Sequence, residues 1–190
     1  MSYLAQTDEI FFNRAGLEQT RVEGIVDEAL DGADDGELFL EYCQSEAISL
    51  EDGRIRHANY DTTQGFGLRS IAGEVSGFAH ASNLSEEALK RAADTVKTVQ
   101  RGHGGTYADP PAGTNRALYG DENPLGSMSF EDKVTLLNEI DAYARAKDPR
   151  VSQVSASLAG EWQAVQIIRP GGLRAADIRP LVRLNVSVVV

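Results

Sequence analysis

Residues 37–60 read "ELFLEYCQSEAISLEDGRIRHANY" and contain the clearest structural signal in the chain. The apolar residues Leu38 and Leu40 recur at alternate positions, which indicates a strand with one apolar face. Asp52 and Gly53 then form a pair that is typical of two-residue hairpin turns, because both residues tolerate a positive φ. This stretch therefore predicts two antiparallel strands joined by a tight turn.

The flanking sequence extends this hairpin and adds helices. Residues 64–82, "QGFGLRSIAGEVSGFAHAS", contain two more extended runs joined around Ala72 and Gly73, which gives a meander of about four strands. Ser85 is a typical N-cap for the amphipathic helix that follows it, and residues 17–30 show a second helical pattern. We expect residues 1–103 to form an N-terminal α+β domain.

A change of composition separates the two halves of the chain. Residues 101–126 hold six glycines and three prolines without sustained periodicity, as is typical of a linker or long surface loop. We place the linker at residues 104–128. Residues 129–190 begin a second α+β domain, in which Ser129 caps a long helix. Strands are predicted there at about 151–158, 162–169 and 181–190.

The last predicted strand carries a row of apolar residues on one face: Val182, Leu184, Val186, Val188 and Val190. An exposed strand of this kind offers unpaired backbone groups and apolar surface to a neighbour, so we expect the C-terminal sheet to be incomplete in this chain. An interior strand of a self-sufficient fold is the alternative. The predicted fold class is α+β, with antiparallel meander sheets and packed helices in two α/β subdomains.

Composition limits the classes of function. The 190-residue chain has 29 acidic and 18 basic residues and a net charge of −11, which disfavours contact with phosphate backbones, so we expect no direct nucleic-acid partner. Cys43 is the only cysteine, which excludes an internal disulfide. The sequence has neither a signal-peptide pattern nor an apolar run of membrane-spanning length, so we expect no membrane association and a cytoplasmic location.

The sequence contains no complete catalytic or metal-binding motif. His57, His80 and His103 are each followed by Ala or Gly, so none of them begins the H-E-x-x-H pattern that places two imidazoles on one helix face. We therefore predict no catalytic residue, no metal ligand and no bound cofactor in this chain.

The local candidate for a substrate-binding site is "GFGLR" at residues 65–69. Gly65 and Gly67 permit close approach of a backbone or ligand, and the guanidinium of Arg69 can bind a carboxylate through two hydrogen bonds. A purely structural interpretation is the alternative, with glycines at bulges or close strand contacts and the arginine in an ion pair.

Several short stretches resemble a known family. They are "SLEDGRI", "DTTQGFGLR", "GFAHAS" followed by the capped helix, "PLGSMSFEDKVTLL" and "EWQAVQIIRPGG". Together they closely resemble the N-terminal region of the TldD branch of the TldD/PmbA family, also known as modulators of DNA gyrase. The resemblance runs from about Gly32 to the end of the chain.

The resemblance implies a cytoplasmic zinc metallopeptidase that cleaves peptides or unfolded proteins and pairs with a PmbA (TldE)-like partner or with itself as a dimer. The family's zinc-binding H-E-x-x-x-H helix lies beyond the point that corresponds to Val190, so zinc is expected in a region that this chain lacks. We therefore expect an N-terminal, non-catalytic portion that is inactive alone and supplies scaffold, dimer and substrate-channel surface.

Two other functions stay open at this point. The older family name suggests a non-enzymatic regulator that binds gyrase or another protein. A stand-alone ligand-binding module is the third possibility, with a ligand held in a cleft near the linker.

Overall fold

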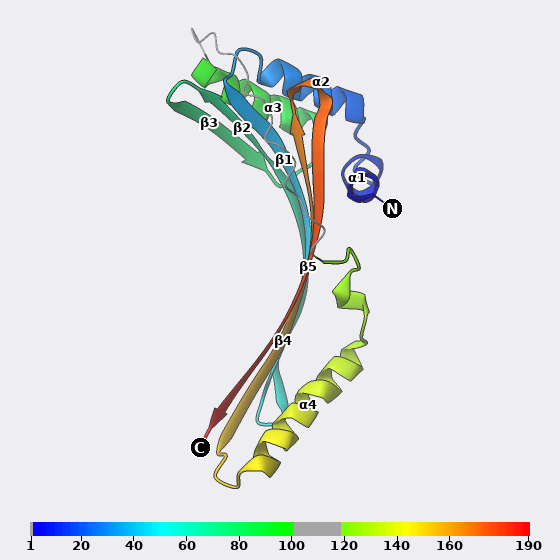
Figure 1. The fold of residues 1–190 in the computed structure, drawn as a ribbon, viewed down its shortest axis with the longest axis vertical. Helices are drawn as coiled ribbons and strands as arrows, with labels where there is room; N and C mark the ends of the chain where they lie inside the picture. The colour runs from blue at the N-terminus through cyan, green and yellow to red at the C-terminus, as the bar shows by residue number, and fades with distance from the viewer. Residues whose placement is uncertain (1, 101–118) are drawn as a thin grey trace. The chain divides into compact units, whose positions relative to one another are not determined.

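The computed structural model describes residues 2–100 and 119–190 and confirms the α+β class. Its strands form one open five-stranded sheet in the order β3-β2-β1-β4-β5, so both predicted subdomains contribute to the same sheet (Figure 1). The strands are β1 (Asp35–Glu51), β2 (Arg54–Ala72), β3 (Val75–Ala81), β4 (Gln153–Arg169) and β5 (Leu173–Val189). The α-helices in the described residues are α1 (Tyr3–Asp8), α2 (Gln19–Ala29), α3 (Glu86–Val96) and α4 (Phe130–Lys147).

The predicted hairpin at Asp52 and Gly53 is confirmed. Both residues have a positive φ, 48° and 71°, which is the geometry that a two-residue turn between twisted strands requires. The next turn, at Gly73, connects β2 to β3, and these strands pair antiparallel from Phe66 opposite Ala81 to Ala72 opposite Val75.

The strands are longer and fewer than the sequence analysis predicts. Residues 37–81 hold three strands and not about four, because residues 61–63 continue β2 without a break. In the same way, the separate strands predicted at 151–158 and 162–169 are one strand, β4. A long neighbour such as β1 offers backbone hydrogen-bond partners along its whole length, and this keeps locally ambiguous residues extended.

The described residues fall into two compact units, and the long strands contribute segments to both. The first unit is drawn from Met1–Tyr42, Thr63–Leu118 and Ala164–Ile178, and the second from Cys43–Thr62, Tyr119–Gln163 and Arg179–Val190. Residues 104–118 of the predicted linker lie outside the described residues. Its remaining residues include the short 3-10 helix η3 (Pro124–Gly126).

In the first unit, α2 and α3 cover one face of the sheet (Figure 1). Leu38 and Leu40 of β1 and Leu68 of β2 are buried on that face. The predicted cap of α3 is confirmed, because the side chain of Ser85 accepts a hydrogen bond from the backbone N–H of Ala88 at 3.3 Å. The side chains of β1 and β2 that alternate with the buried ones lie on the opposite face, which none of the helices in the described residues covers.

The second unit has its own core between α4 and the sheet. Ile48 and Leu50 of β1, Ala156 of β4 and Leu137 of α4 form one buried cluster. The predicted cap at Ser129 is confirmed by a 3.1 Å hydrogen bond from the backbone N–H of Asp132. Val182, Leu184, Val186 and Val188 of β5 are exposed, as expected of an edge strand in an open sheet.

Candidate functional site

A groove of about 560 Å³ lies in the first unit, on the sheet face opposite α2 and α3. It is lined by Phe39 and Glu41 of β1, residues 63–67 of β2, and Phe78, His80, Ala81 and Ser82 of β3 and its C-terminal end. Most of this lining is apolar. The groove therefore spans three adjacent strands at a place where no helix among residues 2–100 and 119–190 covers the sheet.

Gly65 and Gly67 form part of the groove floor because they remove two side chains from the middle strand. A Cβ atom on Gly65 would lie 2.8 Å from the carbonyl oxygen of Ala81, and one on Gly67 would lie 3.0 Å from the ring of Phe78. From Phe66 to Ala72, each residue of β2 pairs with one residue of β3, so Gly67 does not lie in a bulge. Close approach by β3 explains both glycines.

Arg69 does not line the groove. Its guanidinium forms an ion pair with Glu37 of β1 at 2.9 Å, on the same exposed face of the sheet. Both side chains are partly exposed, so the pair contributes little to stability, about 0–1 kcal/mol. The structure thus brings Gly65 and Gly67 together in the groove and places Arg69 beside it.

Two aromatic rings of β3 project from the same face. Phe78 and His80 are stacked with ring centroids 5.6 Å apart, and the register places His80 opposite Gly67. Phe78 is 62% exposed although it is a large apolar side chain. The sequence analysis did not identify Phe39, Glu41, Phe78 or His80 as site residues. Their alternate spacing in strands next to a glycine-containing strand is the signal that could have indicated them.

The described residues do not offer the donor set of the zinc site that the family resemblance implies. Across residues 2–100 and 119–190, no three His, Cys, Asp or Glu side chains gather closely enough to hold a metal ion. His57 and His80 belong to different units, and His103 lies outside the described residues.

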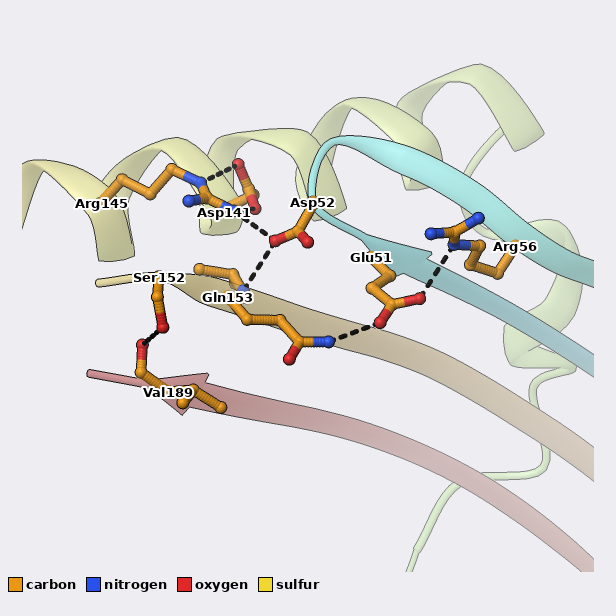
Figure 2. Close-up of polar contacts among 9 residues, drawn as sticks. Glu51, Asp52, Arg56, Asp141, Arg145, Ser152, Gln153 and Val189 are labelled. Atoms are coloured by element: carbon orange, nitrogen blue, oxygen red, sulfur yellow. Dashed lines mark hydrogen bonds and ion pairs between the residues drawn. The ribbon is translucent and has the colours of Figure 1, made fainter. Parts of the chain in front are cut away.

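A polar cluster in the second unit has a structural role (Figure 2). The carboxylate of Asp52 accepts a hydrogen bond from the backbone N–H of Val154 at 3.0 Å and forms an ion pair with Arg145. Arg145 also bonds Asp141, one turn earlier on α4, at 3.2 Å. These contacts connect the β1–β2 turn to both β4 and α4.

The electrostatics of this cluster follow from the same contacts. The Val154 N–H, followed by the guanidinium of Arg145, holds the pKa of Asp52 below its ordinary value. Nearby, the carboxylate of Glu51 accepts a hydrogen bond from the side-chain amide of Gln153 and forms an ion pair with Arg56 at 2.9 Å (Figure 2). The hydroxyl of Ser152 donates a hydrogen bond to the carbonyl oxygen of Val189 at 3.1 Å. Asp141 is buried, the other charged groups of the cluster are partly exposed, and all of these charges are paired. We therefore assign the cluster a structural role.

The helices in the described parts of the chain include none that is long and apolar enough to cross a membrane.

Two family matches cover most of the chain. Residues 36–99 match the description "PmbA/TldA metallopeptidase domain 1", and residues 123–190 match "PmbA/TldA metallopeptidase central domain". A protein named metalloprotease TldD homolog, from Haemophilus influenzae, is 39% identical over 160 residues, which are 83% of this chain and 33% of that protein. Another of that name, from Buchnera aphidicola subsp. Schizaphis graminum, is 34% identical over 158 residues, with the same two shares. The chain thus spans about a third of the length of these relatives.

Solved structures share the fold. A proposed modulator of DNA gyrase from Bacteroides thetaiotaomicron superimposes with a TM-score of 0.69 at 17% identity, over 90% of this chain and 40% of that one. TldE from Thermococcus kodakarensis superimposes with a TM-score of 0.54 at 16% identity, over 88% of this chain and 42% of that one.

Proposed function

Because this chain belongs to the TldD/PmbA metallopeptidase family, we propose that it forms the N-terminal, non-catalytic portion of a zinc metallopeptidase that acts on peptides or unfolded proteins. The observation that carries this proposal is the consecutive match of residues 36–99 to domain 1 and of residues 123–190 to the central domain. The named relatives are about three times as long as the stretch they share with this chain.

In this proposal the groove is part of the surface that receives the substrate. An unfolded segment is extended and exposes its side chains alternately, so it fits a sheet face that is open between neighbouring strands. Phe39 and Phe78 supply apolar contact along the groove. The edge strands β3 and β5 are candidate surfaces for contact with a PmbA (TldE)-like partner or a second copy.

The zinc ion and its ligands are assigned in this proposal to polypeptide outside residues 1–190. Support comes from the poor fit of the described residues to a metal site and from the greater length of the relatives. The described residues would then position the substrate without taking part in its hydrolysis. A cytoplasmic location goes with this function.

The direct test is to incubate purified 1–190 with ZnCl2 and a library of quenched fluorescent peptides, beside a zinc peptidase as positive control. We expect the chain to retain peptides on a filter or column and to cleave none. Zinc-dependent cleavage that EDTA abolishes would contradict the non-catalytic assignment. Absence of any retained peptide would contradict the substrate-surface assignment.

A regulator that binds gyrase or another protein is the competing function, and it is favoured by the fold shared with a proposed modulator of DNA gyrase. A net charge of −11 points such a regulator toward protein and not toward DNA. Pull-down with purified gyrase and with a TldE-type protein separates the two functions. Stoichiometric capture of gyrase alone favours the regulator, and capture of the TldE-type protein alone favours the peptidase subunit.

A further inference from the structure

We infer that the outer edge of β3 binds the substrate peptide by backbone pairing, so that an extended segment becomes an additional strand of the sheet. The inference rests on the proposed function, because it names the strand that holds the peptide and the way in which it does so. Three features of β3 support it: the direction of its backbone groups, its composition and the side chains beside its edge.

β3 lies at one edge of the sheet, and its register with β2 fixes which of its backbone groups point outward (Figure 1). Ala72 and Val75 close a two-residue hairpin turn and are therefore a hydrogen-bonded pair. In an antiparallel ladder, such pairs alternate with pairs that exchange no hydrogen bonds. The residues of β3 in these other pairs direct their N–H and C=O groups away from β2, and they are Ser76, Phe78 and His80.

A contact on the β1 side of β2 supports this assignment. Ile71 lies opposite Ser76, and its carbonyl oxygen accepts a hydrogen bond from the backbone N–H of Asp34 at 2.8 Å. Ile71 thus directs its carbonyl group away from β3, as expected for a pair that exchanges no hydrogen bonds. Across residues 2–100 and 119–190, β2 is the only strand that pairs with β3, so the outward groups of β3 can pair with an added strand.

The composition of β3 leaves this edge open to pairing. Native proteins protect edge strands with charged residues, prolines or bulges, because the unpaired backbone groups otherwise pair with other chains. β3 has the sequence VSGFAHA, without Asp, Glu, Lys, Arg or Pro, and its pairing with β2 contains no bulge. The opposite edge strand, β5, contains both charged residues and a proline, which are Arg174, Asp177, Arg179, Pro180 and Arg183. β3 is therefore the edge that lacks these protections.

The side chains beside this edge suit an extended peptide. Phe78 and His80 project from the sheet face that carries the groove, since His80 lies opposite Gly67 of the groove lining. An added strand places every second side chain on that face, next to the Phe78 ring, which is 62% exposed. Backbone pairing then supplies the affinity, and the ring favours an apolar or aromatic neighbour. Such a site accepts many sequences.

A peptide fits this edge better than a second copy of the chain does. β3 has seven residues and is therefore about 24 Å long, whereas a specific dimer interface buries about 1,000 Å² or more. Two copies of the chain also repel one another, because each carries a net charge of −11. A short neutral peptide meets neither obstacle.

The first experiment measures binding of a short fluorescent peptide to 1–190 by anisotropy. Val and Thr alternate in this probe, and two derivatives carry backbone N-methyl groups, one on every Val and the other on every Thr. A strand that pairs along one of its edges uses the N–H groups of one set only. We expect one derivative to bind about tenfold more weakly, because backbone hydrogen bonds are lost, and the other to bind within about twofold of the probe.

The second experiment locates the added strand by amide hydrogen exchange, measured residue by residue with NMR spectroscopy. In the free chain, the outward N–H groups of Ser76, Phe78 and His80 should exchange rapidly. The N–H groups of Gly77 and Ala79 bond to β2 and should be protected, so they serve as the internal control. Saturating peptide should slow exchange of the three outward amides at least about tenfold.

Two variants at Ser76 test the same assignment from the protein side. Ser76→Pro removes an outward N–H and leaves the hydrogen bonds to β2 in place, because proline is tolerated in an edge strand where the N–H faces solvent. It should weaken binding of the probe about fivefold, and circular dichroism checks that it is folded. Ser76→Ala is the matched control, because it removes the hydroxyl and keeps the N–H, and it should change binding less than about twofold.

The outcomes separate this inference from the proposed function. Equal binding of the probe and both derivatives, or an equal loss in both derivatives, overturns backbone pairing while peptide binding stands. A loss in one derivative without protection at Ser76, Phe78 or His80 assigns the pairing to another edge and also overturns the inference. Failure of the probe to bind overturns the β3 assignment, and failure of a whole peptide library overturns the proposed peptide surface as well.

Discussion

Gly65 and Gly67 lack the same atom but face different neighbours. A Cβ on Gly65 would meet the backbone carbonyl oxygen of Ala81 at 2.8 Å, and that atom is fixed by the β2–β3 pairing. A Cβ on Gly67 would meet only the outer edge of the Phe78 ring, at 3.0–3.1 Å, and that ring is largely exposed and free to turn away. The two glycines are therefore not equally replaceable.

We expect Gly65→Ala to lower the free energy of unfolding by about 1–3 kcal/mol, because the backbone of β3 must move. Gly67→Ala should cost less than about 1 kcal/mol, because one side chain moves instead. Urea denaturation followed by circular dichroism measures both. A cost for Gly67→Ala equal to or greater than that for Gly65→Ala would show that the floor of the groove is not held by β3 in the way described.

Among the strands and helices, the turn between β1 and β2 shows how one residue connects several elements. Asp52 takes the turn conformation with φ 48°, accepts from Val154 of β4 and pairs with Arg145 of α4. These contacts stabilise the charged carboxylate, so the folded-state pKa lies below the ordinary value of 3.8. The associated stability is present above that value and is lost as the pH falls through the lower folded-state pKa.

The prediction concerns the difference in the free energy of unfolding between wild type and Asp52→Asn. Wild type should be the more stable protein at pH 6 to 7, and the difference should shrink as the pH is lowered below the ordinary pKa of 3.8. Other carboxylates titrate in both proteins, so the comparison isolates Asp52. Thermal melts at a series of pH values measure the difference, and a gap that stays constant down to strongly acidic pH would be evidence against this role.

The turns and helix caps that depend on local chemistry could be predicted from the sequence. The Asp52–Gly53 turn and the caps at Ser85 and Ser129 follow from residues within a few positions of one another, and each is confirmed. The continuity of β2 through residues 61–63 could not be predicted from local periodicity, because it depends on pairing along the whole length of β1. Wherever strand length is set by the neighbour, local periodicity underestimates it.

The candidate groove was predictable only in part for the same reason. Gly65 and Gly67 could be identified because glycines inside a strand pattern are unusual. Phe39 and His80 lie in the groove only because β1, β2 and β3 are neighbours in the sheet. The sequence does not state that order or register. Arg69 was a reasonable candidate by residue type, but Glu37 on the adjacent strand already pairs with it.

In the proposed function, the first unit recognises the substrate and polypeptide outside residues 1–190 carries the catalytic groups. The second unit adds a helix-covered sheet with its own core, and its edge strand β5 carries exposed valines that suit contact with further polypeptide. The two family matches, residues 36–99 and 123–190, each contain segments of both units. The assignment can be tested without knowing the natural substrate.

Hydrogen–deuterium exchange of 1–190, with and without a saturating extended peptide, tests this assignment most directly. The account predicts slower exchange at residues 63–67 of β2 and 78–82 of β3, with little change in α4 or β5. Protection confined to the second unit, or binding without protection at either groove strand, would contradict it.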